Sequence, residues 1–166
     1  MVKQTSFVKK NMFVALTLSS TAIFIALPSS AQEQPFVGQV VAVTDGDTIK
    51  VMHLGKPTTI RLDAIDCPES GQAFGTKAKE FTAGLCFRKD VTVTPHKLDK
   101  YRRTIADVTL PDGRSLNTEL VKSGFAWWYR KYAPSNSELE QLEKQARESK
   151  IGLWQEKDPL SPWDFR

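Results

Sequence analysis

The sequence predicts an α+β domain in which five short strands close into a small β-barrel, the OB-fold, with three α-helices outside it. A chain of 166 residues with 40% hydrophobic and 25% charged residues has the composition of one globular domain. Short segments rich in valine and isoleucine alternate with Gly-, Pro- and Asp-containing turns, as strands do. Three other segments place apolar residues at helical spacing, and the resulting order of strands and helices favours the OB-fold.

The first 31 residues differ from the rest and predict a secretory signal peptide. Lys3, Lys9 and Lys10 precede an apolar run over residues 12–27, and Ser29 and Ala31 supply the small residues of a cleavage site. Serine and threonine interrupt the run, which is too short and too polar for a transmembrane helix. We expect cleavage after residue 31, with an uncleaved membrane anchor as the alternative. Cleavage removes three lysines and no acid, so the net charge falls from +4 to +1, and recognition of a polyanion must depend on local charge patterns.

Five segments of the exported chain have the pattern of strands. They are residues 36–43, 48–54, 58–65, 90–94 and 104–110. In the third segment Ile60, Leu62 and Ala64 alternate with Arg61 and Asp63, which indicates a half-buried strand. The first three segments predict a meander, and together the five predict an antiparallel barrel.

Three segments have the pattern of helices. Residues 70–85 place apolar side chains on one face, with Ser70 as the expected cap. Residues 117–123 form a short helix that ends at Gly124, and a last helix begins after Ser135 or Asn136 and ends at Gly152. We expect the domain to span residues 32–155 and residues 156–166 to form a C-terminal tail.

Acidic residues follow two of the predicted strands. By itself, the Asp-Gly sequence at Asp45 is typical of a hairpin turn. A meander, however, returns the end of the third strand to the start of the second, so that Asp47 and Asp66 can meet. Two carboxylates and a main-chain carbonyl suit Ca²⁺, whereas His53 and His96 form no softer metal site. Since Arg61 and Asp66 would point to opposite faces of a regular strand, the strand must end or bulge before Asp66.

Basic and aromatic residues are the other candidates for a binding site. The run around Tyr101 contains Lys97, Lys100, Arg102 and Arg103, and it is consistent with either a solvated loop or a phosphate site. Arg61 stands among apolar neighbours and needs an acid or a phosphate as its partner. In the aromatic segment 126–132 we expect Trp127 or Trp128 to pack in the interior, while Tyr132 either stacks on a base or packs.

Four of these motifs occur together in one known family. They are Asp45-Gly46-Asp47-Thr48, Ile60-Arg61-Leu62 with Ile65-Asp66-Cys67-Pro68-Glu69, Asp99-Lys100-Tyr101-Arg102-Arg103, and Gly152-Leu153-Trp154. From about residue 38 to residue 154 the chain resembles the staphylococcal-nuclease-like thermonucleases. The resemblance implies a five-stranded OB-fold barrel with three helices. It also implies Ca²⁺-dependent hydrolysis of DNA and RNA, with single strands favoured and 3′-phosphate ends produced.

The resemblance also implies roles for individual residues. Asp47 and Asp66 would bind Ca²⁺ through their carboxylates and Cys67 through its main-chain oxygen, while Glu69 would orient or deprotonate the attacking water. The remaining roles concern the substrate: Arg61 and Arg103 would hold the phosphate, Lys100 and Tyr101 would contact a terminal phosphate, and Tyr132 would contact a base. The chain departs from the family at Cys67, where Thr is frequent, at Arg102, where Gly is common, and at Arg130, where a base-contacting Tyr is expected.

The two cysteines, Cys67 and Cys86, flank the first predicted helix. An even number of cysteines in an exported protein usually pairs, so we expect a disulfide, with two buried thiols as the alternative.

The leading interpretation is therefore an exported monomeric nuclease without stable membrane association after signal cleavage, in the periplasm or outside the cell. Two alternatives remain: an OB-fold module that binds single-stranded nucleic acid without cleaving it, and one that binds glycan or protein at the cell envelope.

Overall fold

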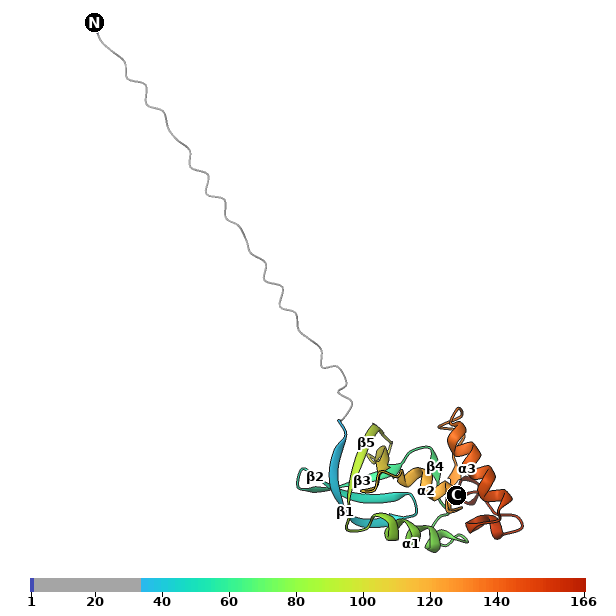
Figure 1. Ribbon diagram of the computed structural model, residues 1–166. Helices are drawn as coiled ribbons and strands as arrows, with labels where there is room; N and C mark the ends of the chain where they lie inside the picture. Colours follow the sequence, from blue (N-terminus) through green and yellow to red (C-terminus); the bar gives the residue numbers. More distant parts are fainter. Residues whose placement is uncertain (2–33) are drawn as a thin grey trace. The chain divides into compact units, whose positions relative to one another are not determined.

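A computed structural model describes residues 34–166, together with Met1. The predicted signal peptide and its cleavage point lie outside the described residues. Five strands form a closed barrel in the order β1-β2-β3-β6-β5 (Figure 1). Their bounds are Phe36–Asp45 for β1, Thr48–His53 for β2, Lys56–Leu62 for β3, Asp90–Leu98 for β5 and Thr104–Thr109 for β6. The predicted five-stranded OB-fold barrel is thus confirmed.

One strand pair differs from the expected antiparallel arrangement. β3 and β6 are parallel, with Ile60 opposite Thr104 and Leu62 opposite Ala106, while the other barrel pairs are antiparallel. The chain passes through a helix and β5 between these two strands, and that crossover lets β6 run in the direction of β3. Residues at alternate positions fill the barrel, and the buried ones include Val40, Ile49, Val51, Ile60, Val93 and Val108.

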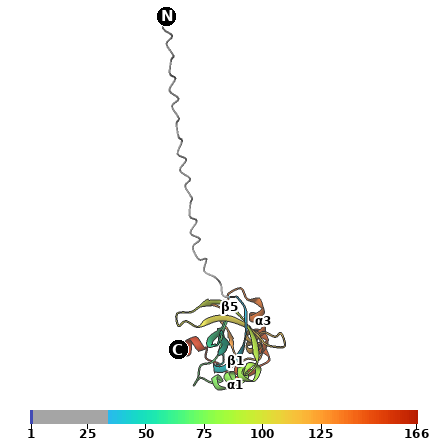
Figure 2. The ribbon, with the colours of Figure 1, turned by 90° about the vertical axis from the view of Figure 1, so that its left-hand side faces the viewer.

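The three predicted helices are present. They are α1 at Gly75–Cys86, α2 at Leu116–Lys122 and α3 at Ser137–Glu148. The labels in Figures 1 and 2 place α1 at one end of the barrel, and α3 lies beside α2. Asn136 caps α3 as predicted, because its side chain accepts a hydrogen bond from the Leu139 N–H at 3.0 Å. Along the described part of the chain, none of the helices has the length and apolarity needed to cross a membrane.

The first helix begins later than predicted. Ser70 is the predicted cap, but Phe74 occupies the N-cap position with a left-handed φ of 66° and no side-chain cap. The helix starts at Gly75, where a Cβ would stand 2.0 Å from the carbonyl oxygen of Glu69. Only glycine permits this close approach, so tertiary packing against residue 69 sets the start of α1.

The segment 156–166 packs onto the domain. After the 3₁₀ helix Gly152–Gln155 it ends in a single helical turn, α4, at Pro162–Phe165. Trp163 stacks on Tyr129 at 5.0 Å and meets Trp127 edge-on at 5.6 Å. With Ala146, Leu153 and Trp154 this region forms a second, smaller hydrophobic cluster. The aromatic contacts attach the segment firmly to the domain surface.

The predicted disulfide is wrong, because Cys67 and Cys86 are both free, buried thiols. Cys67 lies against the first turn of α1, near Ala78, whereas Cys86 is the last residue of that helix. Eight residues of helix separate the two positions along the axis by about 12 Å, well beyond the Cα spacing of about 6 Å that a disulfide allows. The thiol of Cys86 instead donates to the Thr82 carbonyl at 3.1 Å.

Candidate active site

The turn between β1 and β2 presents Asp47 to the interior. Its Gly46 leaves no room for a side chain, since a Cβ there would lie within 3 Å of Cys67 and Ala78. The hydroxyl of Thr82 in α1 donates to the Gly46 carbonyl at 2.6 Å. The turn is therefore held against α1, and Asp47 is buried in front of it.

Asp66 reaches the same place because β3 ends before it. The chain turns at Ala64, which has a left-handed φ of 62°, and the amide of Asn117 holds this turn by donating to the Asp63 carbonyl at 3.0 Å. A short strand β4, Ile65–Asp66, then pairs with β7, Trp127–Trp128. The predicted interruption between Arg61 and Asp66 is confirmed, and it turns Asp66 toward Arg61.

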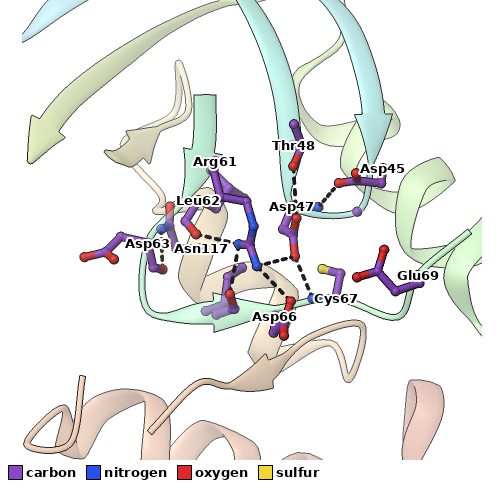
Figure 3. A network of polar contacts seen from close by, with 12 residues as sticks. Asp45, Asp47, Thr48, Arg61, Leu62, Asp63, Asp66, Cys67, Glu69 and Asn117 are labelled. Atoms are coloured by element: carbon purple, nitrogen blue, oxygen red, sulfur yellow. Dashed lines mark hydrogen bonds and ion pairs between the residues drawn. The ribbon is translucent and has the colours of Figure 1, made fainter. Parts of the chain in front are cut away.

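Arg61 joins the two carboxylates. Its Nη2 lies 3.0 Å from Asp47 Oδ2 and 2.8 Å from Asp66 Oδ1, while its Nη1 donates to the carbonyls of Leu62 and Ile65 at 2.7 and 2.9 Å. The Arg61 side chain is only 11% exposed. Figure 3 shows its guanidinium between the two acids, with Cys67 and Glu69 following along the chain. The main-chain N–H of Cys67 donates to Asp47 Oδ2 at 2.7 Å.

Glu69 belongs to the same cluster through Arg166, which lies in the segment predicted to form a C-terminal tail. Nη1 of Arg166 lies 2.5 Å from Glu69 Oε1, and its Nη2 lies 2.5 Å from Asp66 Oδ2. The aromatic residues before it, Trp163 and Phe165, were the available signal that this segment packs on the domain. Sequence reasoning missed Arg166 because no local pattern relates a residue to a site 100 positions earlier.

Burial shifts the acid–base equilibria of this cluster. Burial and the neighbouring Asp47 carboxylate raise the pKa of Asp45 to about 6. Burial also raises the pKa of Asp66, against the opposing effect of the Arg166 and Arg61 guanidinium groups. For Arg61, burial opposes the charged form, but Asp47 and Asp66 outweigh it and raise the pKa. The cluster thus concentrates negative charge that needs cations for its stability.

Arg103 lies on the neighbouring strand, in a separate network. It directly precedes β6, whose Ile105 pairs with Arg61, so strand alternation directs Arg103 to the same face as Arg61. Asp99 holds it: Oδ2 accepts from Arg103 Nε at 2.8 Å, and Oδ1 accepts from the main-chain N–H groups of Tyr101 and Arg103 at 2.9 Å. Between them, Arg102 adopts a left-handed φ of 62°, which explains physically why Gly suits this position.

The predicted substrate residues lie on the surface around this loop. Tyr101 is 68% exposed, and the cationic groups of Lys100 and Arg103 lie 4.9 and 5.5 Å from its ring. Tyr132 is 60% exposed, with the Lys97 ammonium 5.7 Å from its ring. These residues form a basic and aromatic surface that is open to solvent.

Three residues of the aromatic segment have structural roles instead. Trp127 and Trp128 are both buried, as expected for packing. Arg130 pairs with the buried Glu143 at 2.7 Å and covers Trp128 at 4.5 Å. Arg130 therefore stabilises the junction of β7 and α3 at the position where a base-contacting Tyr was expected.

The acids offer oxygen ligands to a hard divalent cation. Within residues 34–166, no group of three or more His, Cys, Asp or Glu side chains is arranged to hold a metal ion. Asp47 and Asp66 nevertheless supply two carboxylates beside the Cys67 backbone, and guanidinium groups already lie against them. A site of two carboxylates, a carbonyl and water has the donor chemistry that such cations prefer, so these residues fit one.

Comparison with known proteins identifies relatives along most of the chain. Residues 59–156 match the family described as staphylococcal nuclease homologue. A protein named micrococcal nuclease from Shigella flexneri is 37% identical, over 89% of this chain and 88% of its own length. A protein named uncharacterized endonuclease from Escherichia coli O157:H7 is 42% identical over 78% of this chain and 84% of its own. One from Haemophilus influenzae with the same name is 34% identical over 91% and 84%.

Proposed function

The chain belongs to the family of staphylococcal nuclease homologues and is a nuclease, and from this premise we propose that it is exported and depends on Ca²⁺. In this proposal it hydrolyses DNA and RNA, with single strands favoured, and leaves 3′-phosphate ends. The observation that carries the proposal is the meeting of Asp47 and Asp66 at Arg61, next to Glu69.

The acids would bind the positively charged metal ion, and the arginines would bind the negatively charged phosphate. Asp47 and Asp66, with the main-chain oxygen of Cys67, would hold the cation, which when bound polarises the phosphodiester and the attacking water. Arg61 and Arg103 present planar, always-charged guanidinium groups on one face of β3 and β6. Such groups stabilise the negative charge that develops on the phosphate oxygens.

Glu69 would orient the attacking water and accept its proton. The water oxygen bonds to phosphorus, the bond from phosphorus to the 5′-oxygen breaks, and the departing oxygen takes a proton from solvent. The phosphate then stays on the 3′-oxygen. The Glu69 carboxylate is suited to this role because it belongs to the acid cluster and is still partly exposed.

The exposed basic and aromatic surface supports binding of the nucleic-acid strand on either side of the reacting phosphate. Lys100 and Tyr101 would contact a terminal phosphate, and Tyr132 would stack on a base, which requires unpaired strands. Export rests on the pattern of residues 1–31. We further propose that the exported protein is a monomer without stable membrane association.

Digestion of denatured DNA by the purified protein tests the proposal, once with Ca²⁺ and once with a calcium-selective chelator. Cleavage that occurs only with Ca²⁺, and whose products are poor primers until a phosphatase removes their 3′-phosphates, is the expected result. Cleavage that continues in the chelator would contradict calcium dependence. The matched variant is Glu69→Gln, in which Ca²⁺ binding should persist while the rate falls. An unchanged rate would remove Glu69 from the mechanism.

The exposure of Tyr101 and Tyr132 also favours a second candidate, a module that binds single strands without cleaving them. The same digestion distinguishes the two. Retained binding to single-stranded DNA with no cleavage under either condition would support the binding module.

A further inference from the structure

Arg166 brings a second guanidinium to the acid cluster, although it lies 100 positions after Asp66 in the sequence. Its Nη2 contacts Asp66 Oδ2 at 2.5 Å, and its Nη1 contacts Glu69 Oε1 at 2.5 Å and Asp66 Oδ1 at 3.4 Å. Arg61 Nη2 also contacts Asp66 Oδ1, at 2.8 Å. Both carboxylate oxygens of Asp66 are therefore in contact with guanidinium groups.

The position of Arg166 is fixed by the segment that carries it. The Gln72 side chain donates to the Leu160 carbonyl at 2.6 Å, and Trp163 stacks on Tyr129. The main-chain N–H of Arg166 donates to the Pro162 carbonyl at 3.1 Å. These contacts bring its guanidinium to Asp66, while the side chain itself remains 46% exposed and has open solvent beside it.

Competition follows from these contacts. A carboxylate oxygen that accepts a close charged hydrogen bond has fewer lone pairs left for a cation, and a cation and a guanidinium on the same carboxylate repel each other. We propose that Arg166 is the internal cation of the metal-free site and that Ca²⁺ displaces it from Asp66 and Glu69. This inference rests on the calcium dependence proposed above. It makes Arg166 a residue that sets the calcium affinity of the site.

Calcium binding to the purified protein, measured by titration calorimetry, tests the inference. Arg166→Gln should bind Ca²⁺ about tenfold more tightly than the wild type, because it removes the competitor. Arg166→Lys, which keeps the charge, should restore most of the competition. Lys157→Gln removes one exposed positive charge from the same segment, and its affinity should stay within about twofold of wild type.

Thermal unfolding of the same proteins distinguishes competition from a structural contact. Arg166→Gln should unfold at lower temperature than wild type in chelator, and the difference should shrink at saturating Ca²⁺, since bound Ca²⁺ takes over the carboxylates. An equal loss under both conditions would mean that Arg166 merely attaches the segment, and the inference would be wrong.

The remaining outcomes separate this inference from the proposed function. A wild type that binds Ca²⁺ and cleaves DNA, with an Arg166→Gln variant of equal or weaker calcium affinity, overturns the inference alone. If that variant also has a raised KM for DNA, Arg166 contacts the substrate instead. Absence of calcium binding in both proteins overturns the inference and the proposed function together, whereas binding only in the variant supports the inference.

Discussion

The two arginines proposed to hold the phosphate, Arg61 and Arg103, are positioned in opposite ways. Arg61 is buried between carboxylates and carbonyls that come from the β1–β2 turn and from the chain after β3. Arg103 is one-third exposed and is held by Asp99, four residues earlier in the same loop. The difference teaches that one half of the site depends on the whole fold, whereas the other depends on a single local contact.

The two regions also respond to pH with opposite sign. Burial raises the pKa values of Asp45 and Asp66, so that ionisation of these groups opposes folding in the absence of a cation. At Asp99 the hydrogen bonds from Arg103 and Tyr101 outweigh desolvation and lower the pKa. Ionisation of Asp99 therefore favours the folded loop.

The largest effect is expected at Arg61. Arg61→Ala leaves two buried carboxylates without their shared partner, so the free energy of unfolding should fall by about 3 to 5 kcal/mol, and activity should be lost with it. Urea denaturation in chelator measures the change. A loss below about 1 kcal/mol would show that the buried network is not what stabilises this end of the barrel.

Arg103 should separate activity from stability. Arg103→Ala removes a partly exposed ion pair, which is worth at most about 1 kcal/mol of stability, but it should lower turnover on single-stranded DNA by at least about 10³-fold. Arg114→Ala is the matched control, because Arg114 is also held by an aspartate of its own loop and lies outside the proposed site. Equal turnover in Arg103→Ala and Arg114→Ala would contradict the phosphate role.

The sequence predicted residues in both halves of the site, but not the contact that the C-terminal segment makes with it. The motifs around Asp47, Asp66 and Arg103 are local, and the strand interruption before Asp66 followed from side-chain parity. Arg166 could not be found in this way, because its contacts depend on how residues 156–166 pack on the second hydrophobic cluster. The disulfide prediction failed for a different reason: it followed from cysteine count and compartment, although the helix predicted between Cys67 and Cys86 already keeps the two thiols apart.

A smaller effect is expected at Asp99. Asp99→Asn weakens the contact that orients Arg103, and turnover should fall about tenfold while stability near pH 7 falls by about 1 kcal/mol. Because the folded-state pKa of Asp99 lies below its usual 3.8, its stabilising contribution is present above that pH and is lost as the pH falls below it. Thermal unfolding should therefore separate wild type from variant at pH 7, and the difference should shrink as the pH falls below 3.8. A constant difference would refute the assigned ionisation.

The smallest effect concerns Asp45 in chelator. Its folded pKa of about 6 exceeds the unfolded value of 3.8, so the stability that it contributes in its protonated form is complete below about pH 4 and is lost as the pH rises through 6. Asp45→Asn, which carries no charge, should be more stable than wild type at pH 7 by about 1 kcal/mol after solvent screening. The two proteins should converge near pH 4, and unfolding curves at both pH values provide the measurement.

The central claim, that Asp47 and Asp66 bind the calcium used in cleavage, is tested most directly by the calcium dependence of the Asp47→Asn variant. Asparagine keeps the shape of the side chain but removes its charge, so the Ca²⁺ concentration for half-maximal cleavage of a single-stranded oligonucleotide should rise at least about tenfold. A half-maximal concentration equal to that of wild type would contradict the assignment of Asp47 as a calcium ligand.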